Sequence, residues 1–566
     1  MSSELPITAG GAIFRRLRQL GVERVFVNSG TDFPPIIEGL AEAQHLGLDL
    51  PHAMMVPHEH VAVSMAHGHY FATGEPAAVI LHTNVGLANG AIGAINAATD
   101  RVPMILMSGR TPTLEGGRFG ARTVPIGWGQ EMRDQAALVR EACKWEYEVR
   151  FPEQVPELLD RAHAIATSTP KGPVYLALPR EVLCEPCPAE ALAAPPRMAA
   201  AAASARSDDI ARAAWLLAKA QRPVIIAQRG AGTPSGFAAL DHIADRYSIP
   251  VCQWWANTNA IASDHPMYVG QNPSPWLDRA DVVLVVDSLA PWMPDAHPLP
   301  DDAQVVQLGP DPLFSRFPVR NFRSNVSVAT ETGPGLMVLS AVLDRLAADG
   351  DVVDRAALRA EVDVFNEERR TGLARAGDLG DGAMTKAFVA ARLGVAMRGR
   401  DGRVVSELGA PLDDYAPTGH QEYRQEPHSG GLGWSLPCAL GMKLAEPDRL
   451  VVATMGDGSY MFANPVAVHH TAEVHGIAVL ALILNNSGYG AVRHSVTDLY
   501  PTGYAAKADR MPLTELSPSP HFRLVAESCR AWAETVTTAS ELDGAITRAI
   551  DQVESGHQAV LDIHIT

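Results

Sequence analysis

Residues 449–459, RLVVATMGDGS, and residues 477–490, IAVLALILNNSGYG, each begin with an apolar run and end in a polar, glycine-containing motif. The apolar runs do not alternate with polar residues, which is typical of strands buried on both faces of a parallel sheet. Gly456-Asp457-Gly458 and Asn485-Asn486 therefore follow the carboxyl ends of two predicted strands. Open α/β sheets bind their ligands at that edge.

The residue types in these two motifs predict a site for a diphosphate and a divalent cation. The Asp457 carboxylate and the Asn486 side-chain carbonyl are oxygen ligands of the kind that Mg²⁺ takes together with phosphate oxygens. The glycines let the backbone approach a diphosphate, and the N-terminus of the helix predicted next favours its negative charge. A simple turn would explain the first motif alone. The two motifs together, each after an apolar strand, favour the metal and diphosphate site.

The same kind of apolar run recurs along the whole chain. Longer helical stretches separate the runs, and this alternation indicates the α/β class, with three successive open α/β domains whose parallel sheets are flanked by helices. The strand-like runs outside the two motifs are VERVFVN (22–28), AAVILHT (77–83), VPMILMS (102–108), GPVYLALP (172–179), RPVIIAQRG (222–230), ADVVLVVDS (280–288), AQVVQLGPDP (303–312) and AVLDIHI (559–565).

Changes in composition predict the domain boundaries. An Ala- and Pro-rich stretch and a charged, Ala- and Arg-rich stretch contain no strand-like run, so we interpret the first as a linker and the second as a helical connector. The predicted order is a first domain over 1–188, the linker over 189–207, a middle domain over 208–345, the connector over 346–380 and a third domain over 381–566.

The composition excludes several classes of protein. The chain has 566 residues, of which 64 are Asp or Glu and 46 are Lys or Arg, giving a net charge of −18. This balance argues against partners that need a basic surface, such as nucleic acids and anionic membranes. No apolar run is long enough to span a membrane, and six cysteines do not form a disulfide framework. We therefore expect a soluble, cytoplasmic protein.

Two further stretches extend the pattern. Residues 56–110 begin VPHEHVAVSMAHGHYFATGE, and residues 429–434 read SGGLGW. Together with GDG and NN, they resemble the thiamine diphosphate enzymes, and in particular the acetolactate synthase and benzoylformate decarboxylase group. The resemblance spans nearly the whole chain. It implies that the first domain binds the pyrimidine of the cofactor, that the middle domain is Rossmann-like and that the third domain binds the diphosphate.

The resemblance also implies roles for single residues around thiamine diphosphate and Mg²⁺. Glu59 matches the glutamate that contacts the aminopyrimidine and promotes formation of the C2 ylid. Leu432 matches the bulky residue that bends the cofactor, and the Gly430 carbonyl would accept from its 4′-amino group. The implied metal ligands are Asp457, Asn486 and Gly488, and the cofactor-binding residues further include Gly456, Gly458 and Ser459.

Three residues match substrate-side positions of the group. His82 falls where benzoylformate decarboxylases carry an active-site histidine, and a histidine at a strand end can relay protons near neutral pH. Thr31 falls where they carry a serine that contacts the substrate carboxylate. Gln130, followed by Glu131, instead resembles the Phe-Gln-Glu run of acetolactate synthases. The chain therefore combines the two patterns.

These features predict a thiamine diphosphate- and Mg²⁺-dependent 2-oxo acid decarboxylase/carboligase that works through a C2 ylid and an enamine. His82 favours a decarboxylase over an acetolactate synthase. Residues 270–276, GQNPSPW, lack the Gly- and His-rich run that contacts flavin, which argues against FAD. Acetolactate synthase-type carboligation, non-decarboxylating cleavage of a diketone or 2-hydroxyketone, and a non-catalytic cofactor-binding protein stay open as alternatives.

The resemblance also implies an assembly. In the group, the pyrimidine domain of one subunit and the diphosphate domain of another hold each cofactor, so we expect a homodimer or homotetramer with active sites at the subunit interface. The partner would be a small-molecule 2-oxo acid, with neither nucleic acid nor membrane involved. The sequence does not define which carbonyl substrate is used, whether decarboxylation or carboligation is the physiological reaction, or whether the assembly is a dimer or a tetramer.

Overall fold

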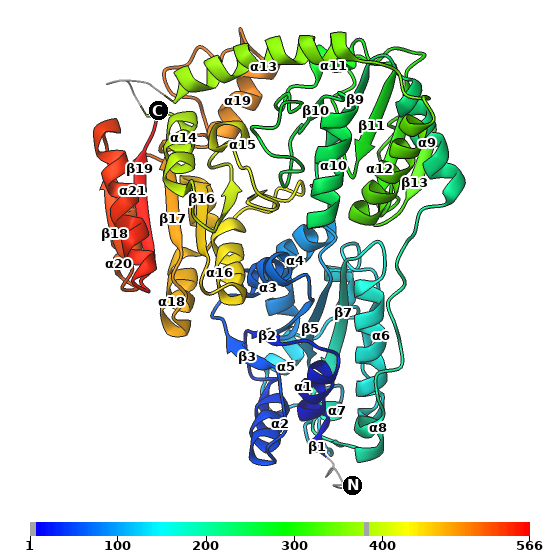
Figure 1. Ribbon diagram of the computed structural model, residues 1–566. Coiled ribbons are helices and arrows are strands. Elements are labelled where there is room, and N and C mark those ends of the chain that lie inside the picture. Colours follow the sequence, from blue (N-terminus) through cyan, green and yellow to red (C-terminus); the bar gives the residue numbers. More distant parts are fainter. Residues whose placement is uncertain (1–6, 378–383) are drawn as a thin grey trace. The chain divides into compact units, whose positions relative to one another are not determined.

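The computed structural model describes residues 7–377 and 384–566, which divide into two compact units (Figure 1). The first unit combines residues 7–201 with Glu426–Thr535 and Arg548–Asp562. The second combines Ala202–Gln425 with Val536–Thr547 and Ile563–Thr566. Segments that are far apart in the chain therefore fold together in the first unit, which contains every predicted cofactor and substrate residue.

The N-terminal part of the first unit is built on a six-stranded sheet of order β3-β2-β4-β5-β7-β6. All neighbouring strands are parallel, as the unbroken apolar runs predict. The strands are β2 (Arg24–Val27), β3 (His52–Met55), β4 (Ala77–Leu81), β5 (Met104–Arg110), β6 (Glu146–Glu148) and β7 (Pro173–Pro179), and β1 (Ile7–Thr8) pairs separately with β8 (Pro186–Cys187).

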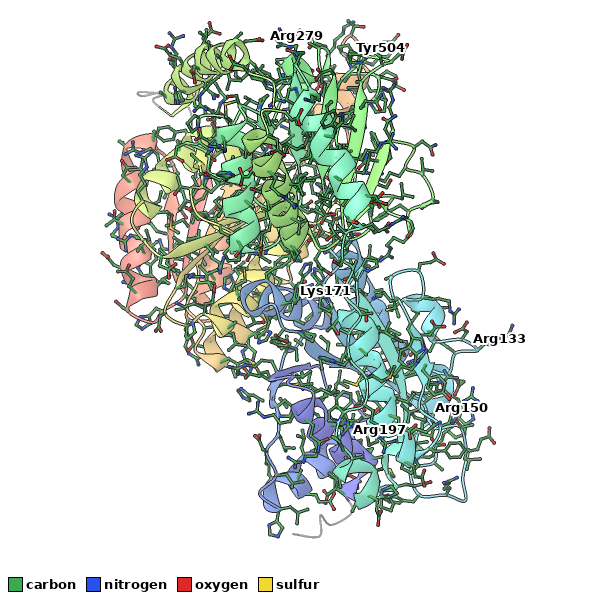
Figure 2. The ribbon with its side chains drawn as sticks, turned by 45° about the vertical axis from the view of Figure 1, so that its right-hand side comes forward. Arg133, Arg150, Lys171, Arg197, Arg279 and Tyr504 are labelled. Atoms are coloured by element: carbon green, nitrogen blue, oxygen red, sulfur yellow. The ribbon has the colours of Figure 1, made fainter. Side chains whose placement is uncertain are left out.

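Helices connect and flank these strands (Figure 1). They are α1 (Ala9–Gln19), α2 (Pro34–His45), α3 (Glu59–Thr73), α4 (Thr83–Thr99), α5 (Ile126–Gly129), α6 (Val155–Thr167), α7 (Arg180–Leu183) and α8 (Ala189–Ala193), with 3₁₀ turns at Ala136–Leu138 and Pro152–Gln154. A buried ion pair joins α1 to α6, because Arg16 Nε and Nη2 donate to the Asp160 carboxylate at 2.6 and 2.7 Å. Arg133, Arg150 and Arg197 are exposed and point outward in Figure 2.

The second unit contains a five-stranded parallel sheet of order β10-β9-β11-β12-β13. Its strands are β9 (Pro223–Ala227), β10 (Val251–Cys252), β11 (Val282–Val286), β12 (Gln304–Gly309) and β13 (Val326–Ala329). Its helices are α9 (Ser207–Lys219), α10 (Pro234–Arg246), α11 (Ser274–Leu277), α12 (Thr332–Ala348) and α13 (Ala356–Ala376). Helix α13 lies within the segment predicted to be a helical connector.

A third sheet has the order β15-β14-β16-β17-β19-β18, and its pairs β14–β15 and β16–β17 are parallel. Its strands are β14 (Gly402–Glu407), β15 (Tyr423–Gln425), β16 (Leu450–Gly456), β17 (Leu480–Asn485), β18 (Trp532–Val536) and β19 (Ala559–His564). The C-terminal helices are α14 (Lys386–Met397), α15 (Leu412–Tyr415), α16 (Ser435–Ala445), α17 (Asp457–Phe462), α18 (Pro465–His475), α19 (Gly490–Leu499), α20 (Phe522–Glu527) and α21 (Ala539–Glu554).

Helices α3 and α16 pack backbone to backbone inside the first unit. A Cβ atom at Gly68 would overlap the carbonyl of Cys438, and one at Gly441 would overlap the carbonyl of Met65. Neither glycine has a positive φ, so both are needed here for space and not for conformation. Beside this crossing, the buried Trp434 donates from Nε1 to His67 Nδ1 at 3.1 Å.

Three parallel-sheet α/β domains are therefore confirmed as the fold class. The proposed boundaries at 188, 207, 345 and 380 stay predictions, and residues 378–383, which span the last of these boundaries, lie outside the described residues. Within residues 7–377 and 384–566, no helix combines the length and the apolar character needed to cross a membrane.

Candidate active site

The predicted substrate-side residues lie at the carboxyl edge of the first sheet. His82 directly follows β4, and residues 28–32 follow β2, which pairs with β4 in the middle of the sheet. Glu59 opens α3 just beyond β3, the strand on the other side of β2. Because the strands are parallel, their carboxyl ends meet at one edge, and side chains from distant parts of the chain come together there.

Glu59 is half-buried at the start of α3. Its Oε2 accepts from Asn89 Nδ2 at 3.1 Å, and α4 approaches it so closely that a Cβ atom at Gly86 would lie 3.1 Å from Oε1. One face of the carboxylate is therefore fixed by α4. This geometry holds Glu59 in place, and its contact with the cofactor stays a prediction.

His82 has a partner on each ring nitrogen. Its Nδ1 bonds to the Asp32 carboxylate, and its Nε2 lies 3.1 Å from Gln130 Nε2. The hydrogen bond with Asp32 and the negative charges of Asp32 and Glu59 raise the pKa of His82, although partial burial acts in the opposite direction. The site thus joins His82 and Gln130, two residues taken from different family patterns, and adds a carboxylate.

Thr31 does not share this contact. Its side chain is exposed, and its backbone carbonyl accepts from Arg180 Nη1 at 3.5 Å. Its neighbour Asp32 is buried instead. Sequence reasoning did not identify Asp32, although its place one residue beyond Thr31, in a loop that follows a buried strand, was an available signal. The contact between Thr31 and substrate stays a prediction.

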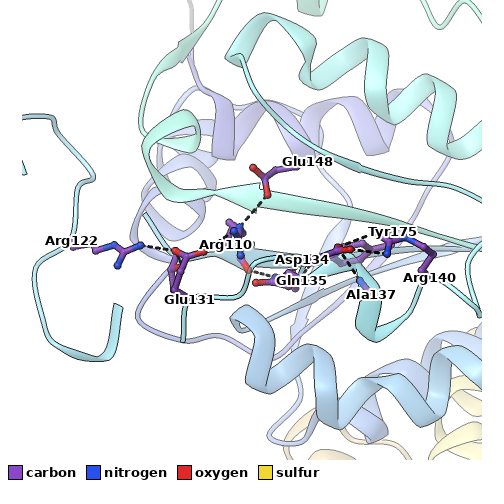
Figure 3. Close-up of polar contacts among 12 residues, drawn as sticks. Arg110, Arg122, Glu131, Asp134, Gln135, Ala137, Arg140, Glu148 and Tyr175 are labelled. Atoms are coloured by element: carbon purple, nitrogen blue, oxygen red, sulfur yellow. Dashed lines mark hydrogen bonds and ion pairs between the residues drawn. The ribbon is translucent and has the colours of Figure 1, made fainter. Parts of the chain in front are cut away.

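The segment that carries Gln130 is anchored by the next residue. The Glu131 carboxylate bonds to Arg110 at 2.6 Å, to Arg122 at 2.5 Å and to the Thr111 hydroxyl at 2.7 Å. Figure 3 shows Glu131 between Arg110 and Arg122. Since Arg110 ends β5 and Arg122 lies in the segment itself, Glu131 ties residues 111–131 to the sheet and fixes the position of Gln130.

The predicted metal ligands come together where β16 and β17 end. Asp457 is buried, its Oδ1 accepts from the backbone N–H of Gly458 at 2.9 Å, and its Oδ2 accepts from that of Gly488 at 3.1 Å. The same Gly488 N–H lies 3.2 Å from Asn486 Oδ1. The Asp457 carboxylate and the Asn486 amide oxygen therefore meet at one backbone N–H, and both are hard oxygen ligands suited to Mg²⁺. That the Gly488 carbonyl is a third ligand stays a prediction.

Of the two glycines of the motif, Gly456 leaves room for a phosphate group, and Gly458 packs closely against Tyr489. Gly456 has no heavy atom within 4 Å of the place where a Cβ atom would stand, and a Cβ atom at Gly458 would lie 2.9 Å from the Tyr489 ring. Ser459, in the first turn of α17, is buried. These residues fit a diphosphate and its cation. The described residues contain no group of three or more His, Cys, Asp or Glu side chains that could hold a metal, so a cation here would rest on mixed ligands.

The loop that contains Gly430 and Leu432 is tied to the helices beside Glu59. Gly430 has φ +67°, which favours glycine, and the Gly431 carbonyl accepts from Asn96 of α4 at 2.8 Å. The imidazole of His60 faces the backbone of Leu432, and burial lowers the pKa of His60 to about 4. The loop with the predicted cofactor residues Gly430 and Leu432 thus lies against α3 and α4, and α3 begins with Glu59.

Comparison with known proteins agrees with this geometry. Models of the thiamine pyrophosphate enzyme family match the chain in three places: the N-terminal TPP-binding domain at residues 7–138, the central domain at 210–321 and the C-terminal TPP-binding domain at 413–563. Together they span most of the sequence in the order that the resemblance implies.

Individual relatives carry both of the names that the sequence patterns suggested. A probable 2-ketoarginine decarboxylase of Pseudomonas aeruginosa is 27% identical, over 96% of this chain and 91% of its own. A benzoylformate decarboxylase of the same organism is 26% identical over 96% of both chains. The acetolactate synthase large subunit of Mycobacterium tuberculosis is 27% identical, over 98% of this chain and 95% of its own.

Solved structures show the same fold. The thiamine diphosphate-dependent 4-hydroxybenzoylformate decarboxylase of Rhodococcus jostii superimposes with a TM-score of 0.78 at 24% identity, covering 99% of this chain and 98% of that one. The family models, the full-length relatives and the grouping of the motif residues lead to one conclusion. The chain belongs to the thiamine pyrophosphate enzyme family, as an enzyme of its decarboxylase and acetolactate synthase type.

Proposed function

We propose that this enzyme is a Mg²⁺-dependent decarboxylase of a 2-oxo acid that releases an aldehyde. The observation that carries the proposal is the placement of His82 at the end of β4, with Asp32 on one ring nitrogen and Gln130 on the other. A histidine held in this way is suited to move a proton near neutral pH. Thiamine diphosphate, when bound, supplies the sink for the electron pair that remains after CO₂ leaves.

The protein's own residues would hold the cofactor and its cation. Asp457, Asn486 and the Gly488 carbonyl would bind Mg²⁺, and Gly456, Gly458 and Ser459 would contact the diphosphate. At the other end, Glu59 would bond to the aminopyrimidine, the Gly430 carbonyl would accept from its amino group, and Leu432 would pack between the two rings.

The first experiment is CO₂ release from a panel of 2-oxo acids, with thiamine diphosphate and Mg²⁺ added and FAD omitted. The panel should run from pyruvate through branched, aromatic, basic and acidic members, and the aldehyde should be quantified with the CO₂. Release of both from one member supports the proposal and defines the substrate class. Failure of every member, with cofactor binding verified by calorimetry, would refute it and favour non-decarboxylating C–C cleavage or a binding role.

A second candidate is acetolactate synthase-type carboligation. Gln130 and Glu131 favour it, because they resemble the Phe-Gln-Glu run of that group. The same assay separates the two functions, since carboligation consumes two carbonyl compounds and yields a longer 2-hydroxy product in place of a free aldehyde. Residues 270–276 argue against FAD, and titration of the purified protein with FAD tests that point.

We also propose that the protein works as a homodimer or homotetramer in the cytoplasm. Large apolar side chains are exposed on α4 and on segment 111–131, close to the predicted catalytic residues, and such patches mark interaction sites. They are Val85, Ile92, Ile95, Leu114, Phe119, Val124, Ile126 and Trp128. The six free cysteines are compatible with a reducing compartment. Sedimentation velocity of the active enzyme tests the assembly, and a fully active monomer would contradict it.

A further inference from the structure

Asp32 is a buried carboxylate, only 5% exposed, at the centre of the strand edge that carries His82. Its Oδ1 bonds to His82 Nδ1, and its Oδ2 faces the backbone N–H of Thr83 at 3.4 Å. Burying a carboxylate is costly unless it is paired and hydrogen-bonded. The imidazole of His82 is therefore the group that stabilises Asp32 in this position.

Two glycines make room for the pair. A Cβ atom at Gly109, on β5, would overlap the Asp32 carboxylate, and a Cβ atom at Gly30 would overlap the His82 ring. Neither glycine has a positive φ, so their backbone conformation is open to other residues. Glycine is required at both positions by space alone. The Asp32–His82 contact is thus built into the packing of three strands and is not a chance surface contact.

The start of α4 is strained around the same pair. Thr83, the first residue of α4, is β-branched and has φ +38°, a region that such residues rarely adopt. His82 caps this helix, and a helix N-terminus disfavours a cation. The charged side chains that act on His82 are nevertheless both acidic: Asp32 from the loop after β2, and Glu59 from the start of α3. Their net effect is that the pKa of His82 is raised, with the Asp32 hydrogen bond as the largest cause.

Gln130 contacts the other ring nitrogen of His82, Nε2. When His82 is neutral with its proton on Nδ1, Nε2 accepts from the Gln130 amide N–H. When His82 is protonated, rotation of the amide by half a turn presents Oε1 to the Nε2–H. Gln130 can therefore bond to His82 before and after a proton moves, whereas Asp32 keeps its contact with Nδ1 in both states.

We propose that Asp32 is a positioning residue that holds His82 and balances the charge of its protonated form, so that the site ends the reaction by protonating the substrate. The proposal rests on the function proposed above. When the bond to the carboxylate carbon breaks, CO₂ leaves and the electron pair stays with the substrate. The Nε2–H bond of His82 then breaks, its proton joins the carbon that lost CO₂, and neutral His82 regains a proton from water. Prompt protonation releases an aldehyde before a second carbonyl compound can react.

Asp32→Asn is the decisive variant, because it keeps the size of the side chain and removes its charge. We expect kcat to fall by about 10²-fold, a typical contribution of general acid catalysis. We also expect the alkaline limb of the pH–rate profile to move to lower pH, and the product to shift from aldehyde toward acyloin. Cofactor affinity should not change. The control is Asp49→Asn, which removes an exposed carboxylate paired with Arg18 at 2.8 Å in the same unit and should leave all four measurements unchanged.

A second measurement does not depend on turnover. The imidazole of His82 is titrated by NMR in the full-length protein labelled with ¹³C-histidine, and its signal is assigned from its loss in His82→Gln. We expect a wild-type pKa above the ordinary 6.5 and, in folded Asp32→Asn, a lower one. A wild-type pKa at or below 6.5, or an unchanged pH profile and product ratio in folded Asp32→Asn, would overturn the role of Asp32. If the 2-oxo acid panel yields no CO₂, the proposed function fails, and the titration still tests the Asp32–His82 pair.

Discussion

The α3–α16 crossing predicts that a Gly→Ala substitution destabilises the protein at the crossing, whereas the same substitution in the exposed part of α13 stabilises it slightly. Gly68→Ala in α3 places a Cβ atom over the carbonyl oxygen of Cys438, 2.7 Å from its carbonyl carbon and 3.0 Å from its Cα. Carbon atoms pack best at about 3.5–4.0 Å, so the two helices must separate by about 1 Å. The atoms in the way belong to a helical backbone, which cannot rotate aside as a side chain can.

The expected change in the free energy of unfolding of Gly68→Ala follows from two opposing effects. Overpacking costs about 1–3 kcal/mol, and a rigid backbone neighbour argues for the upper end. Replacing a helical glycine by alanine returns about 1 kcal/mol. The net loss of about 2 kcal/mol lowers the melting temperature of a unit of this size by about 3 °C. The matched control is Gly372→Ala in α13, where Gly372 is exposed and has no heavy atom within 4 Å of the Cβ position. It should melt slightly higher than the wild type, because only the helix propensity changes.

Scanning calorimetry of the two variants and the wild type makes the comparison, since it resolves separate transitions if the two units unfold independently. Gly441→Ala should behave like Gly68→Ala, because its Cβ atom would lie 2.7 Å from the Met65 carbonyl carbon. The double variant should lose less than the sum of the two, since the first separation of the helices relieves the second overlap. A Gly68→Ala protein that melts at or above the wild-type temperature would refute the close packing of α3 on α16.

Three other perturbations test separate parts of the first unit. His469 is fully buried between Tyr460 and Gln558, and burial lowers its pKa from 6.5 to about 4, so the stability that its neutral form gives above pH 6.5 is lost as the pH falls toward 4. At about 1.4 kcal/mol per pH unit, the loss at pH 5 is about 2 kcal/mol, and a melting temperature equal at pH 7 and pH 5 would speak against it. Arg16→Met leaves the buried Asp160 unpaired and should cost about 3–5 kcal/mol in urea unfolding; a loss below 1 kcal/mol would contradict a buried ion pair. Asp457→Ala removes the one carboxylate among the predicted metal ligands and should abolish the Mg²⁺ dependence of thiamine diphosphate binding in calorimetry, whereas a binding isotherm still responsive to Mg²⁺ would exclude Asp457 as a ligand.

The fold was largely predictable because its signals are local. Unbroken apolar runs give parallel strands directly, and a polar motif after such a run has to lie at the carboxyl edge of the sheet. For this reason Asp457 and Asn486 were predicted together, and so was the place of His82 at the end of β4. Glu59 and Gln130 were predicted from the family resemblance, because neither composition nor periodicity marks these two residues as functional.

The features that could not be predicted from the sequence depend on contacts between distant segments. Asp32 and His82 are 50 residues apart and meet only because β2 and β4 are neighbours in the sheet. No local pattern tells whether Thr31 or Asp32 turns inward from the loop after β2. The pyrimidine-side and diphosphate-side segments also pack into one compact unit, although the middle segment separates them in the sequence. That packing rests on Gly68 and Gly441, which look like ordinary helix residues in the sequence.

The packing of α3 on α16 also affects how the chain folds during its synthesis. His67 and Trp434, which meet beside the helix crossing, are separated by 367 residues. A ribosome that adds about 5–20 residues per second needs roughly 20–70 s to supply the second half of this contact. During that time the face of α3 that carries Gly68 has been synthesised, but α16, which packs on it, has not. The whole of the intervening segment emerges and folds in the same interval. Newly made chains should therefore rely on chaperones during this interval, and truncated chains that end before α16 should aggregate even though their N-terminal sheet is intact.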